Sequence, residues 1–148
     1  MDYRSEDFLV DGALRDVCVL DAGVEDWQRM LSSLSSTGWE VSFATTLAEE
    51  PPGLLVNARE LFDLLALDGE ASARLAIHVE EIWFTCYFFD VEEIEFTFDP
   101  EDVSDEASFR SLESFIGWLG DSSRKQVVMT MEGTDHRSMP AILEYQPA

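Results

Sequence analysis

The chain has 148 residues, a length typical of one domain with a sizeable hydrophobic core. Its formal net charge is -22, because 31 acidic residues stand against 9 basic ones. This charge argues against nucleic acids and anionic membranes as direct partners, since proteins bind both mainly through Lys and Arg. Basic proteins and cations remain as partner classes. The hydrophobic fraction of 46% fits a folded globular protein.

Residues 1–13 are polar and mixed in charge, and they predict a loosely held N-terminal arm that docks through Phe8, Leu9 and Val10. These residues show neither the basic start nor the apolar run that is typical of a signal peptide. No apolar run in the sequence approaches the ~20 residues that a membrane span needs. We therefore expect a cytoplasmic protein without a membrane anchor.

The next segments alternate between strand and helix patterns. Residues 16–20 predict a short buried strand, and Asp21 is a suitable N-cap for the helix that follows. Apolar side chains of this helix recur at helical spacing, at Val24, Trp27, Leu31 and Leu34. Residues 39–45 alternate between apolar and polar side chains, which predicts a strand with one face in water.

A loop at residues 49–53 leads to a second helix. Asn57, with Glu60 three residues later, resembles a capping box at its start. Gly69 is expected to end this helix in the left-handed conformation. A third helix is predicted after Ser104 as N-cap, with Gly120 as its end. The buried side chains of this third helix are expected to be Phe109, Leu112, Phe115, Ile116 and Leu119.

The second half of the chain is dominated by strand patterns. The predicted strands are residues 74–79, 82–89, 93–98, 126–131 and 141–145. Very short connections between the first three predict an antiparallel meander. The whole pattern predicts a single α+β domain with a mostly antiparallel sheet. This sheet contains a central three-stranded meander, and about three helices pack chiefly on one of its faces.

Motifs that carry chemistry are weak or absent. The sequence has no glycine-rich phosphate loop and no nucleophile elbow. His78 and His136 are read as surface or loop residues, because neither has a Ser or Cys at a suggestive spacing. Asp99 to Asp102 offers oxygen ligands but lacks the pattern of a calcium loop. We therefore predict no catalytic residue, no cofactor and no specific metal site. Cys18 and Cys86 lie in apolar runs, which favours two buried thiols over a disulfide.

The most informative feature is an acidic and aromatic stretch between Leu75 and Phe109. It carries eleven carboxylates and no Lys or Arg, and seven aromatic rings are interleaved with them. A disordered acidic tail would lack those rings. The stretch is therefore expected to be folded and to hold like charges close together, which costs stability through self-repulsion.

Side chains alternate across a strand, so the meander can be sorted into two faces. One face is entirely apolar and is the expected core: Leu75, Ile77, Val79, Ile82, Phe84, Cys86, Phe88, Ile94, Phe96 and Phe98. The other places Trp83, Tyr87 and Phe89 beside acids of the third strand. Large rings with a polar rim are typical of interface centres. The alternative is that a helix or the N-terminal arm covers these rings.

We expect the second face to bind a cationic protein. The predicted partner-binding residues are Glu80, Trp83, Tyr87, Phe89, Glu92, Glu93, Glu95, Asp99, Glu101 and Asp102. Carboxylates beside rings would meet Lys or Arg through charge-assisted hydrogen bonds and cation–π contacts. Long-range attraction would also speed association, less so as salt rises.

In class, this combination resembles the acidic immunity proteins of bacterial polymorphic and contact-dependent toxin systems. The residues that carry the resemblance are Glu80, Glu81, Trp83, Tyr87, Glu92, Glu93, Glu95, Asp99, Glu101 and Asp102. The resemblance implies a protein that inhibits a nuclease-like toxin enzyme by occluding its basic active site. It rests on no family motif.

Three other functions stay open at this point. The first is a nucleic-acid mimic that occupies a DNA- or RNA-binding protein. The second is a small enzyme or ligand-binding domain with a pocket around His78, Trp83 and Tyr87, for which His136 is a further candidate. The third is an acidic adaptor subunit. The sequence gives no oligomeric state.

Overall fold

The structure of the protein is a computed structural model that describes residues 1–47, 57–133 and 140–147. The described residues form an α+β domain, with three α-helices and one seven-stranded antiparallel sheet. The strands are β1 (Arg15–Val19), β2 (Glu40–Thr45), β3 (Ala73–Val79), β4 (Ile82–Tyr87), β5 (Ile94–Phe98), β6 (Val127–Met131) and β7 (Leu143–Tyr145). The helices are α1 (Val24–Ser33), α2 (Ala58–Leu67) and α3 (Glu106–Ser123). The expected order of elements along the chain is confirmed.

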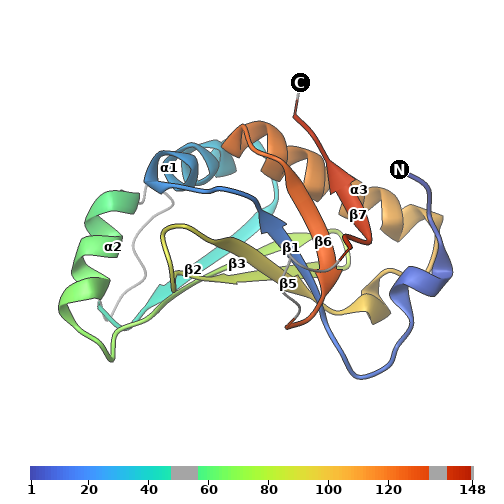
Figure 1. Ribbon diagram of the computed structural model, residues 1–148, viewed down its shortest axis with the longest axis horizontal. Helices are drawn as coiled ribbons and strands as arrows, with labels where there is room; N and C mark the ends of the chain where they lie inside the picture. The colour runs from blue at the N-terminus through green and yellow to red at the C-terminus, as the bar shows by residue number, and fades with distance from the viewer. Residues whose placement is uncertain (48–56, 134–139, 148) are drawn as a thin grey trace.

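The strands lie in the order β2-β3-β4-β5-β1-β6-β7, and every neighbouring pair is antiparallel. The meander β3-β4-β5 is confirmed near the centre of this order. Strand β1 lies between β5 and β6, so the N-terminal strand pairs with the last strand of the meander (Figure 1). This placement brings side chains of β1 beside those of β5.

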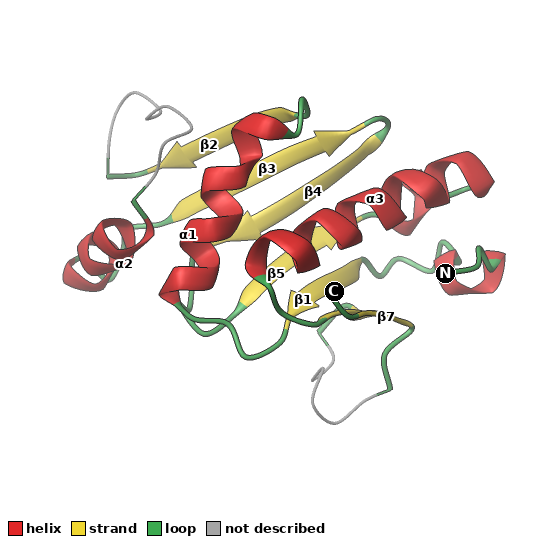
Figure 2. Cartoon of the chain, turned by 90° about the horizontal axis from the view of Figure 1, so that it is seen from above, coloured by secondary structure: helices red, strands yellow, loops and turns green. Residues whose placement is uncertain are grey.

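The three helices lie on the same face of the sheet, as the sequence predicted (Figures 1 and 2). The core fills the layer between them, and all ten side chains assigned to the apolar face of the meander are buried. Phe115 of α3 is at its centre, stacked on Phe84 with ring centroids 3.7 Å apart. The expected buried stripes of α1 and α3 are confirmed, except that Val24 is only partly buried.

Several predicted helix ends are wrong. Helix α1 begins after Gly23 rather than Asp21, because the Asp26 carboxylate accepts a hydrogen bond from the Gly23 amide. Helix α3 begins after Asp105 rather than Ser104, since Asp105 accepts from the Ser108 amide at 2.8 Å. It continues past Gly120 to Ser123.

The start of α2 is confirmed, with the Asn57 side chain accepting from the Glu60 amide. The helix stops at Leu67 with Asp68 as its C-cap, so Gly69 follows it as the C′ residue, as predicted. The predicted left-handed conformation of Gly69 is wrong, because this residue has no positive φ. The predicted loop at residues 49–53 lies outside the described residues. No helix in the described part of the chain is long and apolar enough to cross a lipid bilayer.

Arg15 is a buried cation that sequence reasoning missed. Its guanidinium is 1% exposed and donates to four backbone oxygens in residues 7–14. Phe8 packs into the core against Phe109 of α3, as expected. The expected docking of Leu9 and Val10 is wrong, because both are exposed: the chain turns here so that its carbonyls face Arg15.

Gly120 allows β7 to approach α3. A Cβ at this position would lie 2.5 Å from the Tyr145 ring, whereas a Cβ at Gly117 would meet nothing within 4 Å. We expect Gly120→Ala to lower the free energy of unfolding by about 1–3 kcal/mol through overpacking. The matched change Gly117→Ala should raise it by about 0.5–1 kcal/mol, since Ala is the better helix former. Equal urea midpoints for the two variants would contradict this account.

Candidate protein-binding face

The sheet face opposite the helices exposes the three rings that the sequence assigned to it. Trp83 is 42% exposed, Tyr87 45% and Phe89 82%. No helix of the described chain covers this face (Figure 1). Exposed apolar side chains that lie together in a patch with a polar rim are typical of interaction sites. We call this surface, between β2 and β1, the open face.

The side chains of Phe88 and Phe89 point in opposite directions where β4 and β5 separate. The two strands pair only at Thr85–Thr97 and Cys86–Phe96. Strand β4 ends at Tyr87, although the Phe88 amide still donates to the Ala73 carbonyl of β3 at 3.1 Å. The Phe88 side chain points into the core and stacks on Trp27, with ring centroids 4.7 Å apart. Trp27 also donates its ring N–H to the Val91 carbonyl at 2.9 Å. These two contacts fix the segment after β4, and they direct Phe89 outward.

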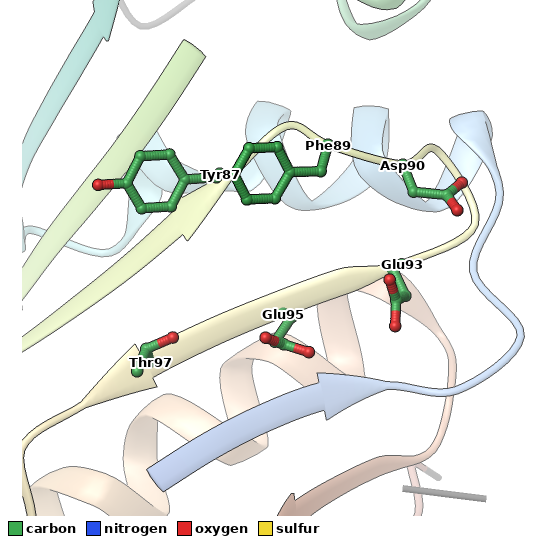
Figure 3. Close-up of a pocket in the computed structure, with 6 residues that line it drawn as sticks. All are labelled: Tyr87, Phe89, Asp90, Glu93, Glu95 and Thr97. Atoms are coloured by element: carbon green, nitrogen blue, oxygen red, sulfur yellow. The ribbon is translucent and has the colours of Figure 1, made fainter. Parts of the chain in front are cut away.

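The exposed rings form one wall of a small pocket. Tyr87 and Phe89 stack on each other with ring centroids 5.3 Å apart and planes within 8°. Side chains of β5 and the preceding turn stand across from them (Figure 3). The pocket of ≈ 70 Å³ is lined by Tyr87, Phe89, Asp90, Glu93, Glu95 and Thr97. Its lining therefore contains three carboxylates and no basic side chain.

Glu95 lies at the centre of a group of like charges. Burial raises the pKa of its carboxyl, and the charges of Asp16 and Glu93 raise it further. The Cys18 thiol, opposite Glu95 on β1, points its sulfur to the carboxylate at 3.7 Å. Burial also raises the pKa of Asp16, partly offset by a hydrogen bond from the Gly133 amide at 3.1 Å. This region would gain from a cation more than a solvated acidic surface would.

Folding raises the pKa of Glu95, so its protonated form stabilises the fold, and this stability is lost as pH rises through the folded-state pKa. We expect Glu95→Gln to raise the free energy of unfolding at pH 7 by about 0.5–1 kcal/mol, the size of a like-charge pair on neighbouring strands. The gain should vanish below the unfolded-state pKa of about 4.3. Urea unfolding at about pH 7 and about pH 3.5 measures both values. A gain that persists at the lower pH would contradict the electrostatic cause.

The other predicted binding residues, apart from Glu92, lie at the opposite end of the meander. They are Glu80, Trp83, Asp99, Glu101 and Asp102. Trp83 stacks on His78 with ring centroids 4.2 Å apart, and the His78 Nδ1 lies 3.2 Å from the Glu40 carboxylate. This agrees with the reading of His78 as a surface residue. Burial raises the pKa of Asp102, as do the nearby charges of Asp99, Glu101 and Glu81. Glu80 is exposed in the β3–β4 turn.

The predicted acidic stretch is thus divided between two ends of the sheet. Glu93 and Glu95 line the pocket with Tyr87 and Phe89, while Glu92 is exposed in the adjacent turn, where its amide bonds the Asp90 side chain. Asp99 caps a short 3-10 helix that contains Glu101 and Asp102 at the other end. Both groups were predicted as partner-binding residues, and the structure places them at different ends of the meander.

Two residues of the open face were missed. Asp16 lies near the acids of the pocket, without lining it, because β1 pairs with β5. In the sequence, only the alternation of Asp16 with Val17 indicated that its side chain belongs to this face. Arg74 pairs with Tyr87 across β3 and β4, so the open face carries one exposed base beside the rings. That base does not line the pocket.

Both cysteines of the chain are buried in the structure. Cys18 and Cys86 are free thiols, as predicted, and burial raises the pKa of both. The described residues contain no group of three or more His, Cys, Asp or Glu side chains placed to hold a metal ion. His136 lies outside the described residues. Comparison with known proteins finds no family, no curated protein and no solved structure that matches this chain.

Proposed function

We propose that this protein binds a cationic protein partner through its open face and thereby inhibits it. The observation that carries the proposal is the pocket beside Phe89, in which two exposed stacked rings face three carboxylates without a base. Rings of this kind attract Lys and Arg through cation–π contacts, and carboxylates bond the same groups. The net charge of -22 would steer such a partner toward the protein from a distance.

The partner class proposed here is a toxin enzyme whose active site binds phosphates, as in the cytoplasmic immunity proteins that this chain resembles. An enzyme that holds nucleic acid presents clustered Lys and Arg. An acidic protein with rigid rings competes for that cluster and covers it. In the complex of the ribonuclease barnase with its inhibitor barstar, close charge pairs of this type contribute to affinity.

The proposal is tested by isolating the partner from the native host with the full-length protein as bait. We expect a basic protein whose enzymatic activity is lost in the complex. Its dissociation constant should rise steeply between about 50 and 500 mM salt, because exposed charges are screened over that range. A partner that is acidic, or whose affinity is independent of salt, would contradict the proposal.

A further inference from the structure

A second hollow adjoins the pocket and shares Phe89 and Asp90 with it. It is a groove of ≈ 510 Å³ between helix α2 and the segment that follows β4. Its apolar walls include Phe62 and Leu65 of α2, together with Phe88 and Val91. The exposed carboxylates of Asp63 and Asp68 also line it. The lining of the groove therefore combines apolar and acidic side chains.

Phe89 and Asp90 line both the groove and the pocket. Phe89 is 82% exposed, and it is the ring that the two hollows share. The pocket is small and has three carboxylates, a composition suited to one guanidinium or ammonium group. The groove is larger, and its walls suit an aliphatic or aromatic side chain. No Lys or Arg lines either hollow in the described part of the chain.

We propose that the partner docks here with a pair of neighbouring side chains, one basic in the pocket and one large and apolar in the groove, on either side of Phe89. This inference rests on the proposed function and names the recognition element of that partner. Charge complementarity selects the occupant, because five different carboxylates line the two hollows: Asp63, Asp68, Asp90, Glu93 and Glu95. An apolar segment without a base would leave these carboxylates without a cationic partner.

The contacts of Phe88 fix the backbone at Phe89, and this supports a site with two hollows. Phe88 is locked against Trp27 and Phe62, with ring centroids 4.7 and 5.8 Å apart. The next residue therefore cannot turn inward without breaking the core. A ring that is exposed and fixed in place loses little conformational freedom on binding, which is the property of an interface hot spot.

The test is selection from a random peptide library on the immobilised full-length protein. We expect enriched peptides to carry Arg or Lys within a few residues of Leu, Phe, Met or Trp. A synthetic enriched peptide is then titrated by fluorescence anisotropy against variants of both hollows. Phe89→Ala, Glu95→Gln and Ala66→Gln should each weaken binding about tenfold or more. Ala66 is exposed and lines the groove, so the longer side chain obstructs the groove without disturbing the core.

Leu9→Ala is the matched control, since Leu9 is an exposed apolar side chain of the N-terminal arm that lines neither hollow. It should leave peptide affinity within about twofold. A second peptide carries norleucine in place of the base. Glu95→Gln should also reduce the ratio of the two affinities, the original peptide over the norleucine peptide, whereas Ala66→Gln should not. Enrichment of peptides without a base, or equal affinity for the Phe89→Ala and native proteins, would overturn the inference.

The failure of this inference is distinguishable from failure of the proposed function. If charge reversal on the open face abolishes binding of a basic host partner, while Phe89→Ala and Ala66→Gln do not affect it, the paired docking is wrong and the inhibitory function stands. A host partner without a basic surface overturns both.

Discussion

The double substitution Glu93→Lys with Glu95→Lys is expected to weaken partner binding by about 3 kcal/mol or more, which is over 100-fold in affinity. Both side chains line the pocket opposite Tyr87 and Phe89. Reversal replaces attraction to a basic surface with repulsion, and it places a cation where the partner's own cation would lie. The measurement is the dissociation constant by titration calorimetry with the isolated host partner.

Fold stability should survive this reversal. Glu95 lies beside Asp16, so a Lys at position 95 removes a like-charge contact instead of creating one. The control is Asp2→Lys with Glu25→Lys, which changes the net charge equally through two exposed acids far from the pocket in the sequence. The control should lose about tenfold in affinity at most, through weaker steering. Equal losses for the two double variants would show that net charge alone drives binding.

Trp27→Ala is expected to lower the free energy of unfolding by about 3–5 kcal/mol. Trp27 is 0% exposed and contacts the rings of Phe88 and Phe62. Its removal leaves a large cavity, and it also leaves the Val91 carbonyl without its donor. Urea unfolding followed by circular dichroism measures the loss. A loss below about 1 kcal/mol would contradict the assigned role of Trp27.

Trp118→Ala provides a control for the effect of Trp27 on the pocket. Trp118 also packs between rings and donates one hydrogen bond, to Ser33 Oγ at 2.9 Å, but it lies on α3 away from the segment after β4. Under native conditions, amide hydrogen exchange in residues 88–93 should accelerate in Trp27→Ala beyond the global change. In Trp118→Ala it should follow the global change alone. Identical exchange in both variants would show that Trp27 does not hold this segment.

The alternation of side chains along the strands was sufficient to predict the two faces of the meander. Alternation placed Phe88 in the core and Phe89 outside, and both placements are confirmed although β4 ends at Tyr87. Side-chain direction in an extended segment depends only on local geometry, so it can be read from sequence. The order of elements was predictable for the same reason, because short connections and periodicity are local signals.

The electrostatic surroundings of the pocket depended on contacts distant in sequence. Asp16 reaches Glu95 only because β1 inserts between β5 and β6. Nothing in the sequence near Phe88 indicates that its ring stacks on Trp27. The helix ends failed for a different reason: Asp105 and Ser104 are both good caps, and the contact of Asp105 with Ser108 decides between them.

The central claim is that the open face, and not helices α1 and α3, contacts the partner. Hydroxyl-radical footprinting of the complex tests it directly, because exposed aromatic side chains oxidise readily and are protected when covered. We predict that Trp83, Tyr87 and Phe89, which are 42%, 45% and 82% exposed in the free protein, become protected on binding. Protection confined to side chains of α1 and α3, with Phe89 still oxidised at its free rate, would contradict the account.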